Sequence, residues 1–190
     1  MTLREEYEQV EIDHRTAILK RVAKVCFSGS TARVLGNSKQ IKKALGIINV
    51  DDLLTLKSEA AFKDWFEKQL AKVVHHIPTE TTKDKPISDG ARQWGYGAKI
   101  LNLFLMDAVL HCRHFTDEEA DRIQYLLYVP LDSKVINRIT ERGEELPFEK
   151  IKEIDSSKKF YDIQCKLGQN AQQVGIPRIW LDDIWANDDD

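Results

Sequence analysis

Two charged side chains stand in settings that could support nucleophilic chemistry. Lys99 directly precedes an almost wholly apolar run, residues 100–111, and follows the closely spaced pair Gly95 and Gly97. Because glycine permits tight backbone turns, we expect a turn into a helix with Lys99 in its first turn. A cation is disfavoured at this helix end, and the same field favours the neutral amine that a nucleophile needs. The alternative is a lysine whose stem lies along apolar surface while its head reaches water.

Asp132 is a second charged side chain in a setting that suits chemistry. It follows the apolar segment 129–131 and precedes a helical period formed by Val135, Ile136 and Ile139, so the pattern predicts a helix N-cap. A carboxylate held by backbone N–H groups stays ionised and fixed in direction, which suits the stabilisation of positive charge in a transition state. Capping alone is the alternative role.

The glycine pair is also a candidate anion site. In the expected turn, the N–H groups of the new helix would point outward beside the positive end of its dipole and suit a phosphate. Gly95 and Gly97 are therefore candidate phosphate-binding residues, and a glycine-containing turn between two core helices is the alternative. Between residues 83 and 113, lysine and arginine exceed aspartate by two, a mild basic bias in the same region.

The elements that must position these residues are helices. Apolar residues recur at a helical period in nearly every long segment, and strand-like alternation is almost absent, so we expect an all-α fold. Phe62, Trp65 and Phe66 are expected in its core. The predicted division is an N-terminal helical lobe, 1–89, and a second lobe, 90–190. The expected helices cover residues 3–27, 39–43, 58–77, 99–111, 116–127, 132 onward and 156–174.

Composition excludes some classes of protein and leaves others open. The chain has 190 residues, 42% of them hydrophobic and 31% charged, as is usual for a globular protein. No apolar run approaches the roughly 20 residues that cross a bilayer, and the charged start does not resemble a secretory signal. Three cysteines without paired spacing suit reduced thiols, so we expect a cytoplasmic protein. A net charge of −3 neither supports nor excludes DNA binding, since a small basic face is sufficient.

The residues offer little for a metal or cofactor. His111, Cys112 and His114 lack a second matching pair of ligands, and a surface helix end is the preferred interpretation of this segment. The cysteines are too scattered for an iron–sulfur centre. We expect no metal and no cofactor.

Three segments resemble one known family. Gly95-Tyr-Gly-Ala-Lys99 is similar to the hairpin of the helix-hairpin-helix DNA glycosylases, especially the lysine-bearing 8-oxoguanine group. Val129-Pro-Leu-Asp132 resembles the segment that opens a later helix in that group, and residues 174–185 resemble the end of its archaeal members. The resemblance spans about residues 90–185 and implies two helical lobes around a cleft.

The resemblance also implies an activity and a partner. A damaged nucleotide would be extruded from double-stranded DNA, and Lys99 would displace the base and form a Schiff base that Asp132 assists. Trp180, Asp182 and Trp185 are candidates for the base pocket, with core packing and helix capping as the alternatives. We further expect a monomer associated with the nucleoid. A helix-hairpin-helix module that binds DNA without chemistry, and a helical interaction protein with chance motif matches, are the other hypotheses.

Overall fold

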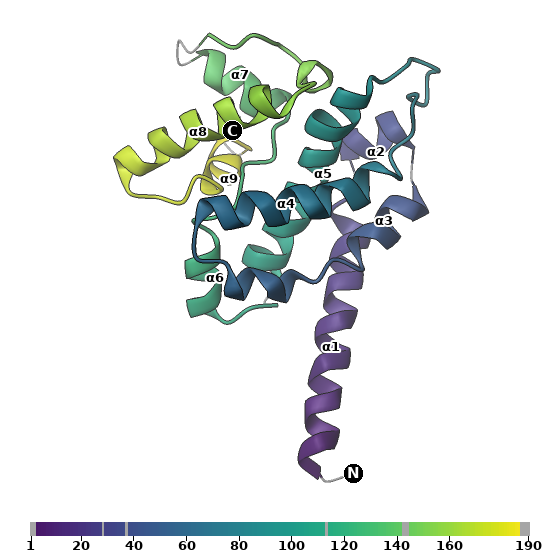
Figure 1. Ribbon diagram of the computed structural model, residues 1–190, viewed down its shortest axis with the longest axis vertical. Coiled ribbons are helices and arrows are strands. Elements are labelled where there is room, and N and C mark those ends of the chain that lie inside the picture. Colours follow the sequence, from purple (N-terminus) through teal and green to yellow (C-terminus); the bar gives the residue numbers. More distant parts are fainter. Residues whose placement is uncertain (1–2, 28, 37, 113, 142–144, 187–190) are drawn as a thin grey trace.

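The protein is all-helical in the computed structural model, which describes residues 3–27, 29–36, 38–112, 114–141 and 145–186 (Figure 1). These residues contain no strand, and a single antiparallel bridge joins Glu80 to Pro86. The predicted all-α class is confirmed. The elements in chain order are α1 (Leu3–Val25), α2 (Gly29–Leu35), α3 (Lys39–Leu45), η1 (Val50–Thr55), α4 (Glu59–Val74), η2 (Ala91–Gly97), α5 (Ala98–Met106), η3 (Asp107–His111), α6 (Asp117–Ile123), α7 (Ser133–Glu141), η4 (Ile151–Glu153), α8 (Ser157–Val174) and α9 (Trp180–Ala186).

Helix ends follow from local side-chain chemistry. The Ser58 hydroxyl accepts a hydrogen bond from the backbone N–H of Ala61 and begins α4. Thr116 and Glu119 form a reciprocal capping box at the start of α6. At the other end of a helix, Gly175 adopts a left-handed conformation, with φ of 73°, and terminates α8. Expected helix positions therefore agree with the structure to within a few residues at these ends.

The core surrounds α4. Phe62, Trp65 and Phe66 are buried, as predicted. The ring of Phe66 stacks on Phe160 of α8 at a centroid distance of 5.9 Å and meets the edge of Tyr128 at 5.2 Å. Buried apolar residues from both predicted lobes belong to one cluster. In contrast, the N-terminal half of α1 projects away from the rest of the molecule (Figure 1).

The segment that contains Gly95 and Gly97 is not a hairpin. The π-helix η2 continues directly into α5, because Gly97 (φ −64°, ψ −48°) and Ala98 (φ −62°, ψ −41°) both have right-handed helical backbones. The N–H of Ala98 donates to the carbonyls of Gln93 and Gly95 within the helix. The predicted tight turn is therefore wrong.

Close packing explains both glycines. A Cβ atom on Gly95 would lie 2.3 Å from the carbonyl oxygen of Ile151 in η4, and one on Gly97 would lie 2.9 Å from a methyl carbon of Val74 in α4. Only glycine allows the backbone to approach the Ile151 carbonyl and the Val74 side chain so closely. Both glycines are buried inside the helix packing, so their predicted role in binding a DNA phosphate is also wrong.

The three cysteines differ in access to solvent, which predicts their reactivity. Burial raises the pKa of the Cys26 thiol to about 12, whereas Cys165 is exposed. Since the thiolate is the reactive form, Cys165 is expected to react quickly with a thiol reagent and Cys26 only after unfolding. Thiol titration of the folded protein, with a Cys165→Ser variant as control, measures this difference. Rapid modification of Cys26 in the folded variant would contradict the packing of α1.

Candidate functional site: a lysine–aspartate pair

Lys99 is buried in the interior of a helix. Its residue exposure is 7%, and its neighbours Ala98 and Ile100 are almost inaccessible. The helical segment that carries it begins at residue 89, more than two turns earlier. The predicted position of Lys99 in the first turn of a helix is therefore wrong. The field of a helix terminus falls off within one turn, so it does not act on Lys99 as expected. Burial is the property that distinguishes this lysine.

Asp132 is the N-cap of α7, as predicted. Its Oδ1 atom accepts hydrogen bonds from the backbone N–H groups of Lys134 and Val135, at 2.9 and 3.1 Å. Its own carbonyl oxygen accepts the first helical hydrogen bond, from Ile136. One carboxylate oxygen is thereby fixed by the helix, and the other is left to face a different group.

The second oxygen of Asp132 faces Lys99. The distance from Lys99 Nζ to Asp132 Oδ2 is 3.4 Å, and the two side chains are 8% and 32% exposed. This distance exceeds the roughly 2.7–2.9 Å of a strong charge-assisted hydrogen bond. Among the described residues, the Lys99 amine has no other hydrogen-bond partner. The structure thus brings together the two side chains that are 33 positions apart, without locking the amine in place.

Asn102 is a further polar side chain on α5, one turn beyond Lys99. It is 1% exposed, and neither its amide oxygen nor its amide nitrogen has a hydrogen-bond partner among the described residues. Leaving such a group unpaired costs about 1–3 kcal/mol, so buried amides usually hold water or a ligand. The sequence analysis missed Asn102, although an isolated amide in the apolar run 100–106 was a visible signal.

The extended segment 127–131, which leads to Asp132, is held by Gln164 of α8. The Gln164 side chain donates to the carbonyl of Val129 at 2.8 Å and accepts from the N–H of Val129 at 2.9 Å. An amide that pairs with both backbone groups of one residue substitutes for a neighbouring strand. Gln164 therefore fixes the path of the chain just before the acidic partner.

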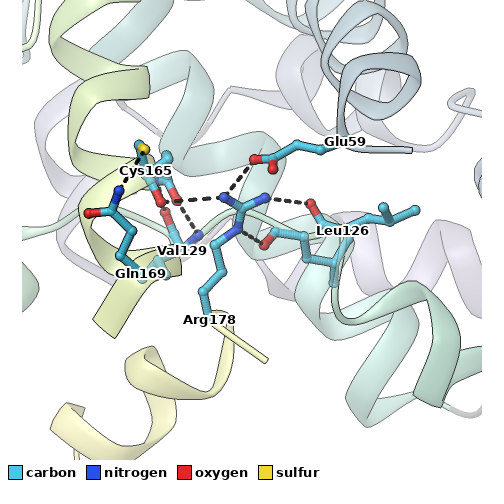
Figure 2. A network of polar contacts seen from close by, with 8 residues as sticks. Glu59, Leu126, Val129, Cys165, Gln169 and Arg178 are labelled. Atoms are coloured by element: carbon cyan, nitrogen blue, oxygen red, sulfur yellow. Dashed lines mark hydrogen bonds and ion pairs between the residues drawn. The ribbon is translucent and has the colours of Figure 1, made fainter. Parts of the chain in front are cut away.

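Arg178 holds the turn at the start of this segment (Figure 2). Its guanidinium donates to the carbonyls of Leu126 and Leu127 at 3.2 and 2.9 Å, and it forms an ion pair with Glu59 at 2.8 Å. It also lies over the Tyr128 ring, 4.5 Å from the centroid. Sequence reasoning identified neither Arg178 nor Gln164, because their partners are distant in the chain.

Substitution of Arg178 is expected to destabilise this part of the fold. Arg178→Met retains much of the stem but leaves the carbonyls of Leu126 and Leu127 without donors, at a cost of about 2–4 kcal/mol. Urea denaturation measures the loss, and Lys68→Met, on an exposed face of α4, serves as the control. A loss within about 0.5 kcal/mol, typical of a surface substitution, would contradict the structural role of Arg178.

The predicted base-pocket residues lie on α9, which packs against α7. Trp180 is 41% exposed, and its indole N–H donates to Gln124 at 2.8 Å. Asp182 is partly buried, whereas the side chain of Trp185 lies outside the described residues. Contact of these three residues with a base therefore stays a prediction.

The histidine segment differs from its predicted form. His114 is 3% exposed, and its Nε2 atom lies 2.8 Å from Asp51 Oδ1, so the interpretation as a surface helix end is wrong for this residue. Within the described ranges, no group of three histidine, cysteine or carboxylate side chains could hold a metal ion. The described helices also include none that is long and apolar enough to cross a membrane.

The geometry of the Lys99–Asp132 pair is the main indication of function. Comparisons of the chain with protein-family models, with curated proteins and with solved structures found no match.

Proposed function

We propose that the protein is a DNA glycosylase with lyase activity, which removes an oxidised purine such as 8-oxoguanine and uses Lys99 as its nucleophile. The observation that carries this proposal is the buried amine 3.4 Å from a single carboxylate oxygen. An ammonium group has three N–H donors, and a purely structural buried lysine needs partners for them. Lys99 has one long contact among the described residues, which suits an amine that must leave its carboxylate to react.

The proposed reaction uses both groups of the pair. The Lys99 amine attacks C1′ of the damaged nucleotide, and the bond from C1′ to the base breaks with its electron pair leaving on the base. Asp132 accepts the proton that the amine loses and returns a proton to O4′ as the sugar ring opens. The product is a Schiff base between Lys99 and C1′. Asp132, again a carboxylate, then accepts a proton from C2′, and the electron pair of that C–H bond expels the 3′ phosphate and nicks the strand.

The setting of Asp132 supports this assignment. The two N–H groups of α7 that hold Oδ1 keep the carboxylate oriented while Oδ2 exchanges a proton with Lys99. Asn102 adds an unpaired amide on α5, one turn beyond Lys99, where a water or a substrate atom could bind. The proposed architecture keeps two helical lobes around a cleft. Its DNA contacts do not include Gly95 and Gly97.

Borohydride trapping tests the activity. The full chain is incubated with a duplex that contains 8-oxoguanine, with the same duplex containing guanine, and with a duplex containing an abasic site. We expect a covalent adduct and a nick with the damaged and abasic duplexes and none with guanine. DNA binding without an adduct on either substrate would instead indicate a module that performs no chemistry. Absence of salt-dependent DNA binding would indicate an interaction protein.

A further inference from the structure

A pocket of about 770 Å³ lies beside α2 and the loop 79–88, and neither Lys99 nor Asp132 lines it. Four cationic side chains line it, and no carboxylate does. None of the four forms an ion pair with a described residue. The nearby carboxylate of Asp89 pairs with Arg92 at 2.9 Å. The cations are Arg33, Lys83, Lys85 and Lys152.

Hydrogen bonds hold three of these cations, Arg33, Lys83 and Lys85, together although they come from distant parts of the chain. The backbone N–H and the hydroxyl of Thr82 donate to the carbonyls of Val34 and Arg33, each at 2.8 Å, and so attach the loop to the end of α2. Within the loop, the Thr81 hydroxyl accepts from the backbone N–H groups of Lys83 and Lys85. Figure 1 shows the loop and α2 at the same side of the molecule. Like charges gathered on an ordered framework, with no carboxylate in the pocket lining, favour an anionic ligand.

The floor of the pocket is apolar. It includes Ile87 and Ala91, which are 8% and 2% exposed, and the ring of Tyr96. Burial raises the pKa of Tyr96, so its hydroxyl stays protonated and remains a hydrogen-bond donor. The volume lies within the range of small-molecule sites, about 300–1,000 Å³. An apolar floor under a cationic rim matches a ligand with a flat ring at one end and a negative charge at the other.

We propose that this pocket binds a nucleotide, with its phosphate against Arg33, Lys83, Lys85 and Lys152 and its base on the floor formed by Ile87, Ala91 and Tyr96. The nucleotide is either free or part of a DNA strand, since both present the same phosphate and base. The proposal does not depend on the chemistry of Lys99. The proposed site recognises phosphate through side chains of the 79–88 loop and its neighbours. Gly95 and Gly97 are buried and cannot supply this recognition.

Equilibrium binding to the full chain tests the proposal at constant ionic strength. The probes are deoxyguanosine 5′-monophosphate, deoxyguanosine, 2-deoxyribose 5-phosphate and a short single-stranded oligonucleotide. We expect the phosphate and the base each to contribute, so that removal of either weakens binding of the mononucleotide by about tenfold or more. Binding of the mononucleotide identifies a free nucleotide as a ligand, whereas binding of the oligonucleotide alone identifies a strand.

A charge-reversal pair reverses two of the four cations of the rim and leaves the loop framework in place. Lys83→Glu with Lys85→Glu changes only side chains, because the loop hydrogen bonds of both residues use their backbone N–H groups. We expect it to weaken binding by at least about tenfold. Lys57→Glu with Lys68→Glu makes the same change of net charge at exposed positions elsewhere and is expected to bind normally.

Three results would overturn the proposal. They are equal affinities of the two double variants, equal affinities for deoxyguanosine and its phosphate, and no binding of either nucleotide form. Lys99→Ala is expected to bind nucleotide like the wild type, which separates this result from the test of the glycosylase activity.

Discussion

Gly95→Ala is expected to lower the free energy of unfolding by about 3 kcal/mol, because the new methyl group would lie 2.3 Å from the carbonyl oxygen of Ile151. The backbone at this position is helical, where alanine is otherwise favoured over glycine. A loss of stability can therefore arise only from the contact with η4. For a chain of this length, the melting temperature should fall by roughly 10 °C.

Gly168→Ala is the matched control, since Gly168 also lies inside a helix. A Cβ there would be 3.5 Å from the Arg178 guanidinium, an ordinary contact. Alanine should stabilise the protein by about 0.5–1 kcal/mol through its helix propensity alone. Calorimetry of both variants gives the comparison. If Gly95→Ala melted like the wild type but lost DNA binding, the hairpin interpretation of this segment would have to be restored.

Inference from the sequence succeeds at the ends of helices. Ser58, Thr116 and Gly175 act on the backbone within a few residues of themselves, so the ends of α4, α6 and α8 could be predicted from local chemistry. The N-cap at Asp132 is of the same kind. Its approach to Lys99 is not local, and was expected only because of the resemblance to the glycosylases.

Non-local contacts explain the predictions that were wrong. A glycine pair suits a turn and a close helix crossing equally well, and what decides between them here is a carbonyl in η4, more than fifty residues later. His114 is buried because Asp51, far earlier in the chain, supplies its partner. Arg178 and Gln164 act on the backbone of residues 126–129, which no pattern near them reveals. Polar groups with distant partners were thus the main features that the sequence did not disclose.

Lys99→Met is expected to abolish the borohydride-trapped adduct and to lower base excision by a factor of about a thousand or more, since it removes the nucleophile. Methionine is similar to lysine in length and flexibility and keeps the buried stem in contact with the core. Asp132 remains partly exposed and remains the N-cap of α7, so the loss of the Lys99 amine should not unfold that helix. Circular dichroism and a melting curve verify that the variant is folded. Full trapping by folded Lys99→Met would place the nucleophile elsewhere.

Two substitutions at Asp132 separate its structural role from its chemical role. Asn is as good an N-cap as Asp, so Asp132→Asn should keep α7 and its stability while removing the group that exchanges protons with Lys99. The expected result is excision slower by about a hundredfold or more with little change in melting temperature. Asp132→Ala loses the cap as well and should be less stable by about 1 kcal/mol. If Asp132→Asn excised bases at the wild-type rate, the carboxylate would serve only as a cap. A rate that falls while the helix stays intact would require the carboxylate itself, because asparagine retains the cap but neither the negative charge nor the ability to accept a proton.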